Sequence, residues 1–414
     1  MGKNMLEVPQ FSLAERDRRW TLVRDLMDKA SLDCLVVWGT SAKWDAQMSS
    51  IRYLTQIGGN GEEGVLIFPR EGDPAMFLWG PAMETSWRKS QEWIKDKDVT
   101  GRPKGRSWPS LIRGQLEQRG LLKGRIGIAS GSLRERDIVP YGIYSNLMKE
   151  LNQAQISNAT DIFDAARLIK SPEEIRFLER AGEAGDAMTE ALRTTALPGV
   201  KECEVFGEVV RAMIAKGGEY PTLLLWGCGS GPEATGPFAH PGRLIPTRPL
   251  QKGDVIIMEM HPKYGGYMTH QERTVFVGEP KKVYRDMYKT AQVGLRRGVE
   301  KLTTEFTVGE PILAMREAIR ESGFSYREAD LTGHGLESGD PPPNVAGVPT
   351  TPAECFQPFR MPDIKFAPGM VVMLNIDVST TDWSTSAFLA ETYLITEREP
   401  RQLTKFDLEP IITV

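Results

Sequence analysis

The stretch from residue 253 to 278, GDVIIMEMHPKYGGYMTHQERTVFVG, constrains the fold of this chain most strongly. Two apolar runs flank a central Gly-Gly, which is the signal of two antiparallel strands joined by a tight turn. Because side chains alternate between the two faces of a strand, Glu259 and His261 share one face. His270 and Glu272 return on the same side of the second strand. The flanking runs are too apolar for an exposed ribbon, so the sequence predicts a hairpin whose four polar side chains converge on a cavity.

The length of the chain and the change of pattern along it predict two domains. At 414 residues the chain is too long for one compact core. Residues 1–165 alternate helical patterns with short apolar runs such as DCLVVWG and GVLIFP, which are typical of buried parallel strands in an α/β domain. Ser171, Pro172 and Glu174 then form the capping-box pattern that begins a long helix. Residues 166–414 carry long strands that we expect to be antiparallel, and we predict an α+β domain there.

Composition and charge exclude several classes of protein. The net charge of −4 and the sequence pI of about 5.8 give no basic face for a nucleic-acid backbone. The chain has no run of about 18 apolar residues and no apolar signal region at its N-terminus, so neither a membrane span nor secretion is expected. The cysteines lack the CxxC spacing of zinc ribbons and redox pairs; they are Cys34, Cys203, Cys228 and Cys355. We therefore expect a cytoplasmic protein that acts on a small-molecule substrate.

The histidines are few and all lie in the second half of the chain, in loops or strands: His240, His261, His270 and His334. A single histidine is more often a structural residue than a catalytic one. Four of them between residues 240 and 334, each beside a glycine, a proline or a strand end, indicate that at least two share a site. An imidazole titrates near neutrality and can give or take a proton there.

The order of these segments resembles the creatinase/prolidase/aminopeptidase P superfamily, whose members share the pita-bread fold. The resemblance covers most of the chain and is carried by segments that follow one another in the family's order: RDRRWTLVRDLMDKASLDCLVVWG, RLIKSPEEIRFLERAGEAGD, GPFAHPGRLIPTRPLQKGDVIIMEM, YGGYMTHQERTVFVG, LTGHGLESGDPPP, PGMVVMLNIDV and FLAETYLITE. It implies an α/β N-terminal creatinase-like domain followed by an α+β pita-bread C-terminal domain, and a hydrolase of the creatinase/Xaa-Pro peptidase kind.

The resemblance also places the family's five metal-ligand positions, which are Asp, Asp, His, Glu and Glu in the metallopeptidases. In this sequence they fall on Glu259, His270, His334, Asn375 and Ala390. Two divalent cations held against a single carboxylate in a buried site would be strongly unfavourable. We therefore expect no cofactor. The alternative is one divalent ion held by Glu259, His270 and His334, a set of two histidines and one carboxylate.

A metal-free enzyme has a precedent in the same superfamily, because creatinase cleaves its guanidino substrate without a metal. The residues that correspond to its functional histidine and glutamate are His240 and Glu272. We therefore expect a metal-independent creatinase-like hydrolase that cleaves a C–N bond of a small amide, guanidino or ureido substrate by His/Glu acid-base catalysis. His334 and Glu391 complete the expected catalytic set. The expected substrate-binding residues are Glu259, His261, His270, Asn375, Asp377 and Arg52.

Three other functions stay open from the sequence. One is an Xaa-Pro dipeptidase or aminopeptidase P-like metallopeptidase with an altered mononuclear site, another is a lyase on the same fold, and the last is a binding protein without catalysis. The resemblance further implies a homodimer, in which Arg52 of one N-terminal domain would reach the substrate in the other subunit's site.

Overall fold

The computed structural model describes residues 7–41, 46–59, 61–130, 139–221, 223–231, 236, 244–337 and 364–414. The chain divides into two compact units, unit 1 at Met1–Arg167 and unit 2 at Leu168–Val414. Each unit has its own sheet and its own hydrophobic core, so the two are described separately. Within the described part of the chain, no helix has both the length and the apolar character needed to cross a bilayer.

Unit 1 is built on a six-stranded sheet of order β4-β3-β2-β1-β5-β6. Only β1 with β5, β5 with β6, and β3 with β4 are parallel pairs, whereas β2 runs antiparallel to both of its neighbours, β1 and β3. The expectation of parallel strands was therefore wrong for the first three, because apolar runs look the same in either direction. The strands are β1 (Cys34–Thr40), β2 (Glu63–Pro69), β3 (Ala75–Leu78), β4 (Val99–Gly101), β5 (Arg125–Ala129) and β6 (Gln155–Asn158).

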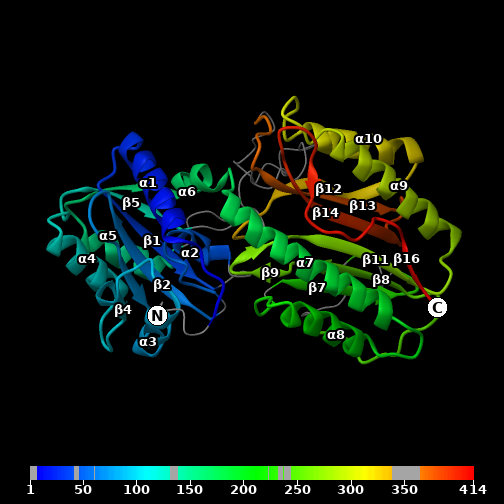
Figure 1. The fold of residues 1–414 in the computed structure, drawn as a ribbon, viewed down its shortest axis with the longest axis horizontal. Helices are drawn as coiled ribbons and strands as arrows, with labels where there is room; N and C mark the ends of the chain where they lie inside the picture. Colours follow the sequence, from blue (N-terminus) through cyan, green and yellow to red (C-terminus); the bar gives the residue numbers. More distant parts are fainter. Residues whose placement is uncertain are drawn as a thin grey trace. The chain divides into compact units, whose positions relative to one another are not determined.

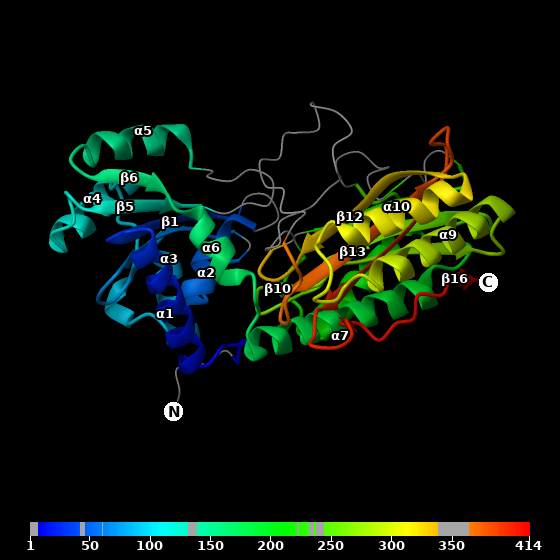
Figure 2. The same cartoon turned by 90° about the horizontal axis from the view of Figure 1, so that it is seen from above.

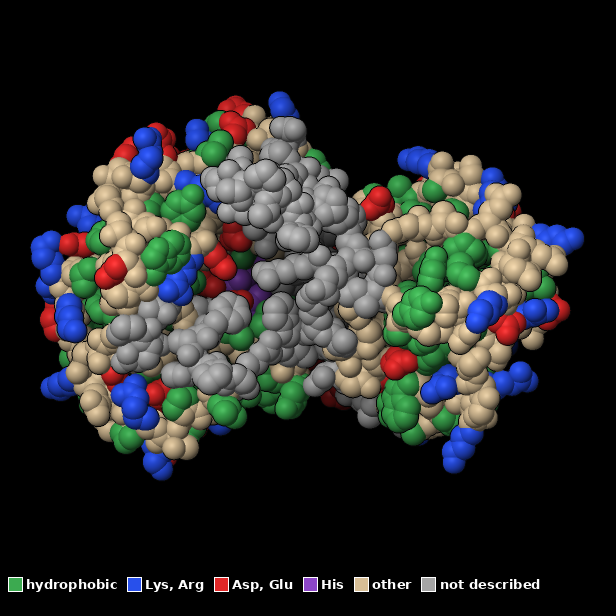
Figure 3. All heavy atoms as spheres, turned by 180° about the vertical axis from the view of Figure 1, so that it is seen from behind, with side chains coloured by type: hydrophobic (Ala, Val, Ile, Leu, Met, Phe, Trp, Pro, Cys, Tyr) green, Lys and Arg blue, Asp and Glu red, His purple; other side chains and the backbone are tan. Residues whose placement is uncertain are grey.

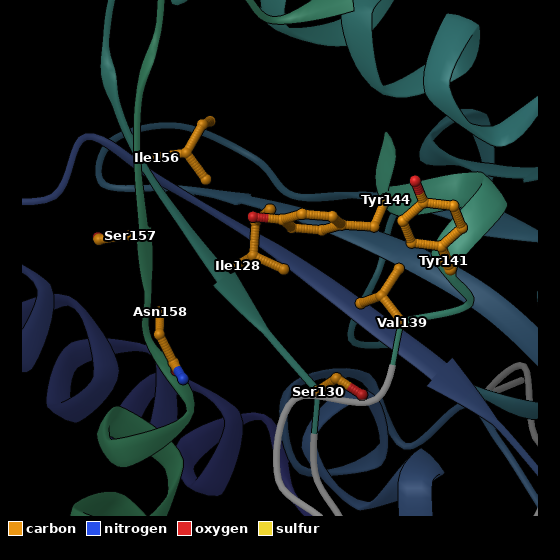
Figure 4. Close-up of a pocket in the computed structure, with 8 residues that line it drawn as sticks. All are labelled: Ile128, Ser130, Val139, Tyr141, Tyr144, Ile156, Ser157 and Asn158. Carbon is orange, nitrogen blue, oxygen red and sulfur yellow. The ribbon is translucent and has the colours of Figure 1, made fainter. Parts of the chain in front are cut away.

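The helices of unit 1 surround this sheet (Figure 1), and one of them borders a hollow. They are α1 (Leu13–Lys29), α2 (Ser49–Thr55), α3 (Pro81–Ser90), α4 (Trp108–Gln118), α5 (Tyr141–Glu150) and α6 (Thr160–Arg167). The hollow, of about 420 Å³, lies beside α5, β5 and β6 (Figure 4). Its described lining offers no carboxylate and no imidazole; it consists of Ile128, Ser130, Val139, Tyr141, Tyr144, Ile156, Ser157 and Asn158. Acid-base chemistry at neutral pH must therefore be sought elsewhere.

Unit 2 contains an eight-stranded sheet in which six strands follow the order β12-β13-β14-β11-β8-β7 and all five pairings are antiparallel. Two short strands join it at the side, β15 (Arg401–Gln402) on β14 and β16 (Ile411–Thr413) on β11. The main strands are β7 (Leu224–Gly229), β8 (Val255–Met260), β11 (Gln271–Val277), β12 (Ser325–Gly333), β13 (Val371–Ser379) and β14 (Ser386–Leu394).

Four helices pack on this sheet in two pairs (Figures 1 and 2). The pair α7 (Pro172–Thr195) and α8 (Glu202–Ala215) forms one core with β7, β8 and β11. The pair α9 (Lys282–Val299) and α10 (Glu310–Ser322) forms a second core with β12, β13 and β14. The first helix of the unit begins as the sequence predicts, with Ser171 and Glu174 in a reciprocal capping box and Pro172 in the first turn.

The apolar side chains under the helices alternate with polar ones along the same strands. On β8, Met258 and Met260 belong to the core under α7 and α8, whereas Glu259 between them points to the other face. On β13, Leu374 and Ile376 pack under α9 and α10, and Asn375 between them is turned away. The sheet therefore presents one apolar face to its helices and one polar face, on which the candidate site lies.

Candidate active site and metal centre

One row of side chains crosses the polar face of the sheet in unit 2. The strand register pairs each member with the next, and directly paired residues project to the same side. The row runs from β8 to β12 and consists of Glu259, Glu272, Ala390, Asn375 and Asp330. In the space-filling view, acidic and histidine side chains gather on this face of the unit (Figure 3). The strand register therefore fixes the order of these side chains across the face.

The hairpin between β8 and β11 brings the first two histidines to one end of this row. Two short strands, β9 (Lys263–Tyr264) and β10 (Tyr267–Met268), close the hairpin, and the two glycines between them have φ values of 55° and 89°. A left-handed turn of this kind is open to glycine at little cost. His261 Nε2 lies 2.8 Å from Glu259 Oε1. The rings of His261 and His270 have centroids 4.0 Å apart, and the four polar side chains of the hairpin do converge.

The third histidine of the cluster comes from the end of β12. The backbone N–H of His334 donates to the carbonyl of Val371, and this bond fixes the residue beside β13. Its ring centroid lies 5.9 Å from that of His261 and 5.4 Å from that of His270. Both ring nitrogens of His270 and of His334 are buried and lack a hydrogen-bond partner among the described residues. Buried imidazole nitrogens in this condition are costly unless a bound group satisfies them.

A subset of these side chains has the composition of a site for one metal ion. Ligand atoms of Glu259, His261 and His270 lie within 4.8 Å of one another, and all three residues are buried. Two imidazoles with one carboxylate suit a single divalent transition metal. The residues present therefore fit one ion. The set differs in one member from the alternative that we drew from the sequence, because His261 stands where His334 was expected.

Burial keeps the three imidazoles in the neutral form that binds metals. It lowers the pKa of His261 to about 3, with a further contribution from the charge of Lys263. Burial also lowers the pKa of His270 and of His334 well below the ordinary value, and neighbouring imidazoles add to the effect in both. No proton therefore has to leave these rings before an ion can bind at neutral pH.

Glu272 sits beside the histidines with a raised pKa. Burial raises its pKa well above the ordinary value, and the surrounding carboxylates, with Glu259 first among them, raise it further. Its Oε1 lies 3.6 Å from His270 Nε2, and its Oε2 has no hydrogen-bond partner in the described part of the chain. A protonated carboxyl in this position can donate a proton to a group that enters the cavity.

The far end of the row is held by β12 and β13. Asn375 Nδ2 donates to Glu328 Oε2 at 2.9 Å. Asp377 projects from the same face two residues along and is fully buried. Burial raises its pKa well above the ordinary value, although the charge of Arg327 opposes the shift. Glu328 and Asp330 were not singled out from the sequence, but a signal was there, because Glu328, Asp330 and His334 follow the two-residue period of one strand face.

The structure contradicts the role that we expected for Glu391. Its neighbour Ala390 faces the cavity, so Glu391 projects from the opposite face of β14. Glu391 Oε2 there accepts hydrogen bonds from Arg273 Nη2 at 2.6 Å and from Thr404 Oγ1 at 2.8 Å. With no exposed surface, it is a structural partner of Arg273 rather than a catalytic acid or base.

Two other residues of the expected site are not placed by this structure. His240 lies outside the described residues, so its catalytic role stays a prediction. Arg52 is a half-buried residue of α2 in unit 1, and its contact with substrate across subunits also stays a prediction.

Known proteins resemble both parts of the chain. Residues 176–397 match the model of metallopeptidase family M24, and residues 19–169 match that of the creatinase/prolidase N-terminal domain. The probable dipeptidase PepE of Mycobacterium tuberculosis is 29% identical over 43% of this chain and 46% of its own length. The Xaa-Pro dipeptidase of Pyrococcus horikoshii is 27% identical over 50% of this chain and 57% of its own length. The chain thus spans about half the length of these curated relatives.

The fold comparison reaches further than the sequence comparison. The solved structure of an Xaa-Pro dipeptidase from Bacillus anthracis superimposes with a TM-score of 0.75, covering 96% of this chain and 99% of that one at 21% identity. At this identity the likeness shows the fold alone. It confirms the creatinase-like N-terminal domain and the pita-bread C-terminal domain that the sequence predicts.

These comparisons contradict the metal-independent creatinase-like function. The matching family is one of metallopeptidases, and the relatives are named dipeptidases and Xaa-Pro dipeptidases. The expectation of no cofactor is wrong for the same reason and because Glu259, His261 and His270 already form a buried ligand set. The error arose from counting carboxylates only at the ligand positions of the family. His261 stands outside those positions but on the same strand face as Glu259.

Proposed function

Because the chain belongs to metallopeptidase family M24, we propose that it is a metal-dependent peptidase that hydrolyses the C–N amide bond of a small Xaa-Pro-like peptide. The observation that carries the proposal is the buried set of Glu259, His261 and His270. We propose one ion and not two, because no second group of three metal-ligating side chains occurs among the described residues. The positions Asn375 and Ala390, where the resemblance calls for carboxylates, offer an amide and a methyl group.

The groups around the ion have separate tasks. A divalent ion held by Glu259, His261 and His270 would supply Lewis-acid polarisation of the scissile carbonyl. The raised pKa of Glu272 favours a protonated carboxyl, which can donate its proton to the nitrogen that leaves. His334 is neutral and fully buried, and its free ring nitrogens can accept a proton from the attacking water. The free Oδ1 of Asn375 can accept a hydrogen bond from a substrate N–H.

The metal content of single variants tests this proposal. Purified protein reconstituted with zinc, manganese or iron should hold about one ion per chain by elemental spectrometry and should hydrolyse Xaa-Pro dipeptides only when loaded. His261→Gln and His270→Gln should each lose the ion. His334→Gln is the matched control, which should keep the ion but lose turnover. Two ions per chain, or full activity after complete metal removal, would refute the proposal.

We also propose that the protein is a cytoplasmic homodimer with domain limits at 1–165 and 166–414. The free thiols of Cys34, Cys203 and Cys228 support a reducing compartment, and the two compact units support the division. Sedimentation equilibrium of the purified protein measures the oligomeric state, and a monomer at micromolar concentration would contradict it.

A further inference from the structure

A second group of polar side chains lies at the β12–β13 end of the polar face, and of its members only Asn375 has a task in the proposed chemistry. We propose that this group, formed by Asp377, Glu328, Asp330 and Asn375, is a subsite for a positively charged organic group, an ammonium or guanidinium, on the substrate. The claim that the cation belongs to a substrate rests on the proposed peptidase function. The claim that the site binds an organic cation does not.

The central member of the subsite is Asp377. It has no exposed surface, and neither carboxylate oxygen has a hydrogen-bond partner among the described residues. The charge of Arg327 opposes the rise that burial causes in the pKa of Asp377, and the backbone N–H of Arg327 contributes less. A buried carboxylate in this state is costly unless a ligand supplies donors or charge. The unsatisfied oxygens therefore point to a bound group.

The strand register at this point is irregular in a way that crowds acids around Asp377. Tyr326 pairs with Val378 and Ala329 with Ile376, so two residues of β12, Arg327 and Glu328, stand opposite the single Asp377. Such bulges redirect side chains and are frequent beside active sites. Here the bulge lets Glu328 reach across to Asn375, whose remaining polar atom, Oδ1, is left without a partner in the described chain.

The charge balance favours a cation as the ligand. Glu328, Asp330 and Asp377 are three carboxyl groups on one patch, and the charge of Arg327 acts on Asp377. The guanidinium of Arg327 lies 5.5 Å from the ring centroid of Trp383 and donates to the Trp383 carbonyl, which holds it at the exposed edge. Arg273 lies on the opposite face of the sheet, paired with Glu391.

The spacing of the carboxyl groups favours an organic cation over a second metal ion. Among the described residues, the only three ligand groups within 4.8 Å of one another are Glu259, His261 and His270. The oxygens of Glu328, Asp330 and Asp377 are therefore too widely spaced to surround a bare ion. They suit a group that presents several N–H donors over a larger span, as ammonium and guanidinium groups do.

An aromatic side chain also favours an organic cation over a metal ion. Phe388 is paired directly with Asp377 across β13 and β14, so both side chains leave the sheet on the same face. Its ring and Arg327 Nη1 lie 3.5 Å and 3.6 Å from the point where a Cβ on Gly236 would stand, so a guanidinium already lies close to this ring. A carboxylate beside an aromatic ring stabilises an organic cation by charge and by contact with the ring. Exposure also decreases from Glu328 to the fully buried Asp377, so the cation would enter from the Glu328 side.

Two matched ligands test the inference on the full-length, metal-loaded protein. Titration calorimetry with n-butylguanidinium and with its neutral isostere n-butylurea should show that the cation binds at least about tenfold more tightly, which corresponds to ~1.4 kcal/mol. Asp377→Asn should bring the ratio close to unity. Glu397→Gln removes one exposed carboxylate in the same unit and should leave the ratio unchanged. Equal binding of the two ligands by the wild type, or an unchanged ratio in Asp377→Asn, would overturn the inference.

A kinetic arm separates this inference from the proposed function. The ratio of kcat/KM for Arg-Pro over citrulline-Pro should fall at least about tenfold in Asp377→Asn. If neither dipeptide is hydrolysed while n-butylguanidinium still binds through Asp377, the peptidase proposal fails and the cation subsite stands. If both dipeptides are hydrolysed equally well by the wild type, the cation subsite fails and the peptidase proposal stands.

Discussion

The buried pair of Arg273 and Glu391 gives the sharpest test of which face of β14 carries the chemistry. Arg273 Nη2 lies 2.6 Å from Glu391 Oε2, and Nη1 donates to the carbonyls of Glu272 and Ala390 at 2.9 and 2.8 Å. The pair therefore links β11 to β14. These two strands are joined in the sheet by one residue pair, Glu272 with Ala390. Both side chains are buried, so removing one leaves the other without a partner for its charge.

The size of the effect follows from this geometry. Glu391→Leu leaves a buried guanidinium uncompensated, which costs about 3–5 kcal/mol. The double variant Arg273→Met/Glu391→Leu removes both charges. Its remaining cost is the loss of two hydrogen bonds to backbone carbonyls, about 1 kcal/mol each. The double variant should therefore be at least ~1 kcal/mol more stable than Glu391→Leu alone. Urea denaturation followed by circular dichroism measures the difference through the midpoint concentrations.

The same variants decide whether Glu391 is structural. If Glu391 only supports Arg273, the double variant should fold, keep its metal and hydrolyse dipeptides, while the exposed control Glu397→Gln should change stability by less than ~0.5 kcal/mol. A double variant that is folded and metal-loaded but at least about 100-fold slower would mean that Glu391 takes part in proton transfer. A Glu391→Leu variant as stable as the control would refute the estimate for the buried pair.

Two further predictions concern stability. Because the pKa of Asp377 is raised in the folded state, the folded protein holds this proton more tightly than the unfolded chain does, and the group lowers stability as the pH rises above about 3.8. Without ligand, Asp377→Asn should therefore raise the Tm at pH 7 and raise it less at pH 4. A lower Tm of the variant at pH 7 would contradict the pKa shift. A Cβ on Gly185 of α7 would clash with the buried side chain of Gln271, whereas one on Gly207 of α8 would meet nothing within 4 Å. Gly185→Ala should therefore lower the free energy of unfolding by about 1–3 kcal/mol, and Gly207→Ala should raise it by up to ~1 kcal/mol. Equal urea midpoints for the two variants would contradict this packing.

The local features of the hairpin and of α7 could be predicted from the sequence because short-range rules determine them. The two glycines fix the turn, and the two-residue period fixes which polar side chains share a face, so the convergence of Glu259, His261, His270 and Glu272 followed directly. The capping box at Ser171 is equally local. The same period would have placed Glu391 on the far side from Ala390. The expected catalytic role of Glu391 was wrong because it was based on its position next to Ala390 in the sequence, although adjacent residues of a strand project to opposite faces.

The composition of the metal set and the shape of the second subsite depend on pairings between distant strands. His261 becomes a ligand candidate because the hairpin sets its ring 4.0 Å from that of His270, a distance that no motif specifies. Glu328 meets Asn375 only because a bulge shifts the register between β12 and β13. An extra residue in one strand is visible only when its partner strand is known. The two-residue period could have marked Glu328 and Asp330, but it could not have shown what they face.

The two proposals together explain how the cavity retains anionic charge after losing ligands. The resemblance implies carboxylates at positions 375 and 390, and this chain has Asn375 and Ala390 there. The carboxyl groups reappear nearby at Asp330, which pairs directly with Asn375, and at Asp377, two residues along the same strand face. Carboxyl groups are thus present beside both positions, at a wider spacing than a metal site needs. A wider spacing weakens the attraction for a compact ion more than for an extended cation, since Coulomb energy falls with distance and only the extended group can approach several carboxylates at once. The same substitutions that remove a second metal ion therefore create a place for a charged group of the substrate.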